Sequence, residues 1–549
     1  MTAFRLTAIV AMWVIQSLTM AYGFIISSTS TKHMQMQRLP NVLPVGKGRS
    51  SASVHSSSLQ NEGTQIQLPD DPAKDESISP QPSSSETFDW ARQWYPALPL
   101  TYIDQSTTPI PFKILGRDLL VWKTADGRFS VLDDSCPHRR APLSTGKIVN
   151  ERTSLACRYH GWEFNADGAC QKIPMMKPGQ STNSKAFCVT SYPFQLHDGL
   201  LWIYLDPTDP SPPTDLPIAS IVDQNEKMSS TWFVDVTPIS YLSLIENSFD
   251  PSHAPFTHEG RGSFSPLHAI PMDKYELVED GISPKGFKLE HTPYQRDAKT
   301  PPGGPLMMTT RQFVPPATNV VKSPFFSTVL HFVPADPNDT MVLGKTFSPL
   351  PKTGVVGNLA QLKPLVDRMA DWFHFQWRLS EAHCRFESQD RMTMQGQDSR
   401  KIRQMKWKDH TPTKSDAGVV AMQKWMKLYG TSGPFPMQSM TPQEGRQPSI
   451  WDRHARFCPQ CKRAIQRMSK LAKLSSRASK LSLGCSGVGA ASSILIPSKR
   501  LSLLAASMIF IVVSVGMRQW TQYSYHTLEK VFASGGNLPE QQLMEIYPS

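Results

Sequence analysis

The stretch that decides the fold reads Cys136-Pro137-His138-Arg139-Arg140-Ala141-Pro142-Leu143-Ser144 and, with eighteen residues between His138 and the next cysteine, Cys157-Arg158-Tyr159-His160-Gly161-Trp162. Each of the two segments carries one cysteine and one histidine, spaced Cys-x-His in the first and Cys-x-x-His in the second. Thiolate and imidazole groups are ligands for soft and borderline metal ions. Two such loops brought together could therefore enclose a metal centre.

Two kinds of metal centre use this ligand set. A Rieske [2Fe–2S] cluster has one iron held by two thiolates and the other by two imidazoles. A zinc ion also accepts two cysteines and two histidines, but zinc fingers usually group cysteine with cysteine and histidine with histidine. The residues around the ligands favour the Rieske cluster, namely Gly146, Gly161-Trp162-Glu163-Phe164, Gly168 and Pro174. We predict a cluster on Cys136, His138, Cys157 and His160.

Residues 1–61 contain no aspartate or glutamate. Arg5 precedes an apolar run, 6–20, and small residues precede Phe24, which is the layout of a signal peptide. A serine-rich, basic stretch of transit-peptide composition follows. Together they resemble the bipartite plastid presequences of algae with secondary plastids; an N-terminal membrane anchor is the alternative, although this run is short for a span. Residues 62–87 are rich in proline, serine and acidic residues, which predicts a disordered linker.

Residues 88–450 contain two predicted domains, each with a β-sheet, and the second also has a long helical pattern. The predicted fold class is therefore α+β. Short β-rich runs separated by turns (112–115, 119–122, 129–132, with 199–205 closing) predict a small antiparallel domain over 88–206. A proline-rich linker, 207–224, follows. A second domain, 225–450, contains alternating strand patterns and a long amphipathic pattern, at 307–314, 327–333, 340–347 and 359–383.

A second constellation reads Asn247-x-x-Asp250-x-x-His253-x4-His258. Two histidines with a later carboxylate form a facial triad, which leaves positions on Fe(II) open for O2 and substrate. A His-x4-His pair alone is common among ordinary surface and core histidines. Downstream of a Rieske motif it predicts a mononuclear iron site on His253 and His258.

On these motifs, residues 88–520 resemble the Rieske non-haem iron oxygenases. Within this family the chain is similar to the plastid branch. That branch includes pheophorbide a oxygenase, chlorophyllide a oxygenase, the protochlorophyllide-dependent translocon component and the inner-envelope Rieske translocon protein. The resemblance implies an antiparallel Rieske domain and a helix-grip catalytic domain. It also implies Asp390 as the carboxylate ligand, with Glu387 and Asp398 as alternatives. It further implies a ring-shaped homotrimer, in which Asp250 joins a cluster histidine of one subunit to an iron-ligand histidine of the next. A helix or turn cap is the simpler role for Asp250.

The C-terminal region begins with a basic segment, 451–480, that contains Cys458 and Cys461. A lone Cys-x-x-Cys is ambiguous between a zinc half-site, a redox dithiol and chance. Here the resemblance implies redox regulation by thioredoxin. Apolar patterns at 481–497 and 501–517 predict one or two membrane spans within 481–518. The basic residues that flank these patterns are expected to lie near anionic lipid. A tail, 519–549, follows.

The formal net charge is +11, and much of it lies beside the apolar C-terminal segments without a recognisable nucleic-acid module. We therefore expect a membrane surface and no nucleic acid as partner. No glycine fingerprint for NAD or flavin follows a predicted strand. The resemblance implies ferredoxin as electron donor and O2 as co-substrate.

The predicted activity is a monooxygenase of the plastid envelope or thylakoid membrane, acting on a chlorophyll-derived tetrapyrrole. Pheophorbide a, opened in chlorophyll breakdown, is the first candidate substrate. The alternatives are side-group oxidation of chlorophyllide a or protochlorophyllide a, and hydroxylation of a phyllobilin. A different class of function is a redox-sensing Rieske component of the plastid import machinery. The second iron site argues against it, because an electron carrier does not need one.

Overall fold

The computed structural model describes residues 88–177, 180–218, 232–260, 264–296, 308–324, 327–347, 371–372, 381–405 and 411–532. Several predicted segments lie outside these residues. They are the presequence 1–61, the linker 62–87, the end of the proline-rich linker, most of the amphipathic pattern 359–383, and the last residues of the tail.

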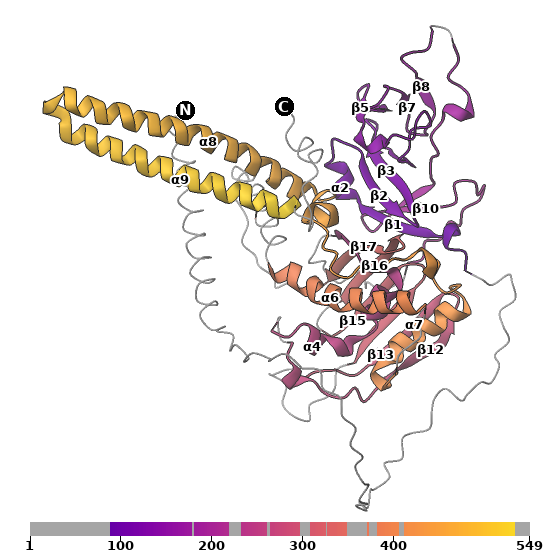
Figure 1. The fold of residues 1–549 in the computed structure, drawn as a ribbon. Coiled ribbons are helices and arrows are strands. Elements are labelled where there is room, and N and C mark those ends of the chain that lie inside the picture. Colours follow the sequence, from indigo (N-terminus) through magenta and orange to yellow (C-terminus); the bar gives the residue numbers. More distant parts are fainter. Residues whose placement is uncertain are drawn as a thin grey trace, which may run out of the picture. The chain divides into compact units, whose positions relative to one another are not determined.

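The N-terminal domain is built from three small antiparallel sheets (Figure 1). Their strands are β1 (Trp94–Pro99), β2 (Ile110–Ile114), β3 (Arg117–Lys123), β4 (Phe129–Asp133), β5 (Lys147–Val149), β6 (Ser154–Ala156), β7 (Glu163–Phe164), β8 (Cys170–Lys172), β9 (Phe194–His197) and β10 (Leu200–Tyr204). The sheet orders are β1-β10-β9, β2-β3-β4 and β5-β6-β7-β8. Strands β2 to β4 and β10 overlap the strand patterns predicted from the sequence. Every residue of β10 is buried, which explains its uninterrupted apolar run.

The second domain contains, in the described chain, a seven-stranded antiparallel sheet of order β11-β17-β16-β15-β14-β13-β12. The strands are β11 (Phe233–Thr237), β12 (Tyr275–Ser283), β13 (Gly286–His291), β14 (Thr309–Val314), β15 (Thr318–Lys322), β16 (Ser327–Asp336) and β17 (Asp339–Phe347). Each strand after β11 pairs with its sequence neighbour, and β11 pairs with β17. The alternating patterns predicted at 307–314, 327–333 and 340–347 correspond to β14, β16 and β17.

Helices pack against this sheet and carry the second constellation. They are α3 (Tyr241–Ser248), α4 (Ala254–Thr257), α6 (Glu381–Gln404) and α7 (Ala417–Leu428). Helix α3 contacts β16, α6 and α7. Helix α7 also contacts β12 and β13 (Figure 1). Aromatic and aliphatic side chains fill the space between them, including Tyr241, Ile245, Phe249, Phe313 and Trp425. This core fixes α3 and α7 on the sheet. Helix α6, which carries the candidate ligand Asp390, packs in turn against α3.

His331 of β16 is a buried histidine whose titration should be visible in the stability of the fold. Its ring lies 5.4 Å from that of Trp202 and 5.2 Å from that of Trp232. Burial lowers the pKa of His331 to about 3. The folded state therefore prefers the neutral ring, whereas the unfolded chain binds a proton near pH 6.5. Stability from this group is present above pH 6.5 and is lost as pH falls toward 3.

We expect the free energy of unfolding to fall, between pH 7 and pH 5, by on the order of 2 kcal/mol more in the parent protein than in a His331→Gln variant. The glutamine side chain can still bond Thr318, whose Oγ1 lies 2.9 Å from Nδ1 of His331. Urea unfolding followed by tryptophan fluorescence at both pH values measures the difference. Equal pH dependence in the two proteins would contradict the assignment.

The C-terminal region forms a helical hairpin of α8 (Pro459–Leu495) and α9 (Arg500–Phe532), which lie side by side (Figure 1). Small polar residues join the two helices: Ser475 bonds Thr521 at 2.7 Å, and Ser479 bonds Ser514 at 3.1 Å. Large apolar side chains face outward, among them Leu481, Val488, Ile494, Leu501, Met508 and Val512. This arrangement reverses that of a soluble helix pair, whose apolar faces meet. In the described residues one helix, Pro497–Leu528, is long and apolar enough to cross a membrane.

Candidate metal centres

The two Cys-His loops are closed by their own backbone hydrogen bonds. In the first, which follows β4, the N–H of Cys136 donates to the carbonyl of Ala141 at 2.9 Å. In the second, which links β6 to β7, the N–H of Cys157 donates to the carbonyl of Trp162 at 2.8 Å. Gly161 lies in this turn with a φ of +72°, a conformation that glycine adopts without strain. Each cysteine is thus the first residue of a tight loop that also carries one histidine.

The four side chains of these loops converge, with the sulfur atoms inside and the imidazoles toward the surface. The rings of His138 and His160 are 4.5 Å apart. Cys136 and Cys157 are 2% and 3% exposed, whereas His138 is exposed and stacks on Trp162 at 4.9 Å. A Rieske cluster needs this asymmetry, because one iron takes thiolates and the other takes imidazoles.

The polar groups around the sulfur atoms favour negative charge. The backbone N–H groups of His138 and Arg139 donate to the sulfur of Cys136, and those of Tyr159 and His160 donate to that of Cys157. The hydrogen bond between the two thiols raises the pKa of Cys136 and lowers the pKa of Cys157 to about 6. Hydrogen bonds to sulfur also tune the potential of iron–sulfur clusters. The residues present therefore fit a [2Fe–2S] cluster.

The second constellation brings two imidazoles to one carboxylate. His253 ends the short 3₁₀-helix η6 (Pro251–His253), His258 caps the end of α4, and Asp390 lies on α6. The Oδ1 atom of Asp390 is 3.5 Å from Nε2 of His253 and 3.3 Å from Nε2 of His258. One ligand atom from each residue lies within 4.8 Å of the other two. Within the described chain, Oδ1 of Asp390 is buried and accepts no hydrogen bond. A cation between these three atoms would satisfy it.

The remaining ring nitrogens of both histidines face oxygen atoms. Nδ1 of His253 is 3.6 Å from Oδ2 of Asp250, and Nδ1 of His258 is 3.3 Å from Oε1 of Gln389. Such partners fix the tautomer in which Nε2 is available to a metal. Burial raises the pKa of Asp390 to about 6. Burial alone would lower the pKa of His253, but the nearby carboxylate of Asp250 raises it. The three groups fit a facial triad.

The structure separates the carboxylates that the sequence left as alternatives. Asp398 accepts hydrogen bonds from the N–H and the hydroxyl of Ser240, both at 2.9 Å, at the start of α3. It therefore lies in a different environment from the histidine pair. The side chain of Glu387 is outside the described residues. Asp250 caps η6 through the N–H of Ser252, as its simpler role predicts, and it also faces His253. Its link to a neighbouring subunit stays a prediction.

Comparison with known proteins indicates the family of the chain. Residues 93–193 match the Rieske [2Fe-2S] domain. Pheophorbide a oxygenase of Oryza sativa subsp. japonica is 27% identical over 483 residues, 82% of this chain and 85% of the relative. Chlorophyllide a oxygenase of Chlamydomonas reinhardtii is 37% identical over 169 residues, 30% of this chain and 24% of the relative. The chain is a Rieske oxygenase. It belongs to the branch of these two enzymes, as the motifs predicted.

The family contains other activities. Flavonoid 8-hydroxylase 2 of Ocimum basilicum is 25% identical to this Rieske oxygenase over 486 residues, 83% of this chain and 88% of the relative. The α+β fold class is confirmed, and the matched Rieske domain indicates a [2Fe–2S] cluster. The individual ligand residues stay predictions, supported by the geometry above.

A cavity of about 560 Å³ borders the candidate iron site of this Rieske oxygenase. Its lining includes Asn247, Asp250, His253, Thr257, Asp390 and Met394. The volume lies within the range of small-molecule sites. A second cavity of about 650 Å³ is lined by other residues, among them Lys113, Asp336, Arg446 and Arg456. The first cavity is therefore the one that can place a substrate next to the triad.

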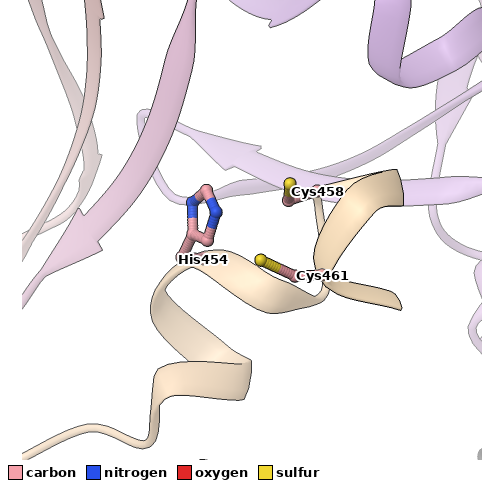
Figure 2. A group of neighbouring side chains, drawn as sticks. All are labelled: His454, Cys458 and Cys461. Atoms are coloured by element: carbon pink, nitrogen blue, oxygen red, sulfur yellow. The ribbon is translucent and has the colours of Figure 1, made fainter. Parts of the chain in front are cut away.

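A third group of potential ligands involves the predicted cysteine pair. His454, Cys458 and Cys461 each offer a ligand atom within 4.8 Å of the other two (Figure 2). The predicted site residues included both cysteines but not His454. The spacing His-x3-Cys-x2-Cys was the available signal, because residues three and four apart on a helical segment lie on one face.

Proposed function

We propose that this chain is a ferredoxin-dependent Rieske monooxygenase with a mononuclear iron on His253, His258 and Asp390. The observation that carries the proposal is the convergence of two imidazoles and one buried carboxylate beside a cavity, in a chain that also has a Rieske domain. When bound, iron on such a triad supplies the chemistry of O2 activation. A redox-sensing import component is disfavoured, because electron transfer alone does not need this second group.

The protein's own residues prepare this site. Asp250 and Gln389 orient the two imidazoles through their Nδ1 atoms, so that both Nε2 atoms face Asp390. His258 is 1% exposed, which limits access of water from that side. The adjoining cavity holds the substrate against the open side of the triad.

The proposed substrate is a chlorophyll-derived tetrapyrrole, with pheophorbide a as the first candidate and oxygenolytic ring opening as the reaction. Similarity to pheophorbide a oxygenase across most of both chains supports it. Oxidation of a chlorophyllide a or protochlorophyllide a side group is a related possibility, supported by the similarity to chlorophyllide a oxygenase. The similarity to a flavonoid 8-hydroxylase favours aromatic hydroxylation as a second candidate function.

The proposed location is a plastid membrane. The relatives are named chloroplastic proteins, and the presequence composition agrees with import into a secondary plastid. We propose that the α8–α9 hairpin inserts with its apolar outer face in lipid and its small polar residues between the helices, as in membrane helix pairs. The basic residues of 462–480 then lie at the membrane surface near anionic lipid.

The proposed assembly is a homotrimer in which one subunit's cluster faces its neighbour's iron site. Two large apolar side chains near the triad are exposed, Phe256 at 60% and Met392 at 75%. Tyr159, next to the candidate cluster ligand His160, is 59% exposed. Exposed apolar side chains at both sites suit burial against a second copy of the chain.

Turnover under labelled O2 tests the function. The detergent-solubilised protein, with reduced ferredoxin, should convert pheophorbide a to an opened macrocycle carrying one labelled oxygen atom, detected by mass spectrometry. Label in a side group of chlorophyllide a or protochlorophyllide a, or on a flavone, would retain the monooxygenase and change the substrate. Absence of label from every compound, with cluster and iron both present by metal analysis, would contradict the proposed substrates.

A further inference from the structure

The base of the α8–α9 hairpin carries a ligand set separate from both iron sites. Its three members come from a sharp junction between two helices. His454 lies in η11, a π-helix over Trp451–Ala455, while Cys458 caps the start of α8 and Cys461 lies in its first turn. Figure 2 shows the imidazole and both sulfur atoms turned toward a common space. We propose that His454, Cys458 and Cys461 bind a zinc ion that joins the hairpin to the catalytic sheet.

The tautomer of His454 suits metal binding. Its Nδ1 atom is 2.6 Å from the backbone carbonyl of Val234 on β11. A carbonyl can only accept a hydrogen bond, so Nδ1 carries the proton and Nε2 carries the lone pair. Figure 2 shows that one ring nitrogen is on the side of the two sulfur atoms. A histidine that binds a metal through one nitrogen usually donates its other N–H to a carbonyl or carboxylate in this way.

Burial and charge favour zinc over a bare dithiol. Cys458 and Cys461 are both 0% exposed, and His454 is 2% exposed. Reactive regulatory cysteines are normally partly exposed, so this environment is unfavourable for direct attack by a thioredoxin. Two thiolates and a neutral imidazole around Zn²⁺ sum to zero charge, which suits a buried site. The N-terminus of α8 also favours the thiolate forms through the helix dipole.

The ligand chemistry selects zinc among common divalent ions. Two thiolates with one imidazole form a set that zinc binds with tetrahedral geometry, leaving a fourth position for water or another small ligand. The position of the group also gives the ion a structural role. Arg453, beside His454, pairs with Asp235 of β11 at 3.1 Å, and both cysteines belong to the core that contains Val234. A zinc ion here would hold α8 against the edge strand of the sheet.

Metal analysis of the full-length holoprotein tests the proposal. Purified from cells supplied with zinc, it should contain about one zinc per chain in addition to its iron. X-ray absorption at the zinc edge should show about two sulfur neighbours near 2.3 Å and a nitrogen near 2.0–2.1 Å. Cys458→Ser, Cys461→Ser and His454→Gln should each lose most of the zinc and keep the visible spectrum of the cluster. Cys170→Ser is the matched control, because Cys170 is buried in the other domain, and its zinc content should not change.

Three results would overturn the proposal. One is zinc-free parent protein with an intact cluster and a Cys458–Cys461 disulfide by peptide mapping, which would assign the pair to redox regulation. The second is zinc whose absorption spectrum lacks sulfur neighbours. The third is a Cys458→Ser and Cys461→Ser double variant with unchanged zinc. If the variants fail to fold, the absorption spectrum of the parent protein decides alone.

Discussion

Replacing Asp390 with alanine is expected to reduce product formation by on the order of a thousandfold, because an iron centre contributes several kcal/mol to its reaction. The reason lies in the geometry of the triad. Asp390 is the carboxylate whose Oδ1 lies 3.5 Å and 3.3 Å from the two Nε2 atoms, and its removal leaves two neutral imidazoles. Two ligands hold Fe(II) much more weakly than three. Iron should therefore fall from about three to about two atoms per chain, with the remaining pair in the cluster.

Metal analysis, paramagnetic resonance of the reduced cluster and turnover under labelled O2 measure the three parts of this result. The cluster signal should be unchanged, because its candidate ligands lie in the other domain. Asp398→Asn is the matched control on the same helix, since Asp398 bonds Ser240 and should affect stability without removing iron. Retention of iron in Asp390→Ala, together with its loss in Glu387→Gln, would move the carboxylate ligand to Glu387.

The cluster loops could be predicted from the sequence because all their determinants are local. Each cysteine and its histidine lie within four residues of one another, and backbone bonds close each loop around them. Strands such as β10 and β16 were also predictable, because buried apolar residues mark them. Strand β12 was not predicted, since its sequence mixes apolar residues with Glu276, Glu279 and Asp280 at the edge of the sheet.

The carboxylate of the triad and the histidine of the third group depend on tertiary structure. The sequence offered three acidic residues on one stretch. Only the packing of α6 against α3 and the His258 loop turns Asp390 toward the histidines and Asp398 toward Ser240. His454 acquires its orientation from Val234, which is far away in the sequence. Spacing along the chain indicates which residues can be ligands, whereas the choice among them is made by contacts between distant elements.

Asp250→Asn is expected to leave the fold and the iron in place and to lower the rate of product formation by roughly 10- to 100-fold. Asp250 has two partners on two oxygen atoms. Oδ1 accepts from the N–H of Ser252 at 3.0 Å and caps η6, while Oδ2 faces Nδ1 of His253 at 3.6 Å. Burial alone would raise the pKa of Asp250, but the neighbouring imidazole of His253 and the hydrogen bonds from Ser252 lower it, so the carboxylate is charged. Asparagine keeps an oxygen for the cap and replaces the charged acceptor next to His253 with an amide.

The measurement that separates the two roles of Asp250 is a single turnover of the pre-reduced protein. If Asp250 connects one subunit's cluster to the neighbouring iron site, re-oxidation of the reduced cluster on mixing with O2 and substrate should slow by the same factor as product formation. Ser252→Ala is the matched control, because it removes only the 2.6 Å bond from the Ser252 hydroxyl to Asp250. An equal loss in that variant would reduce Asp250 to a helix cap. Normal re-oxidation with slow product formation would limit it to orienting His253. A path between subunits requires that cluster re-oxidation and product formation both slow in Asp250→Asn while iron is retained. It also requires that neither rate slows in Ser252→Ala.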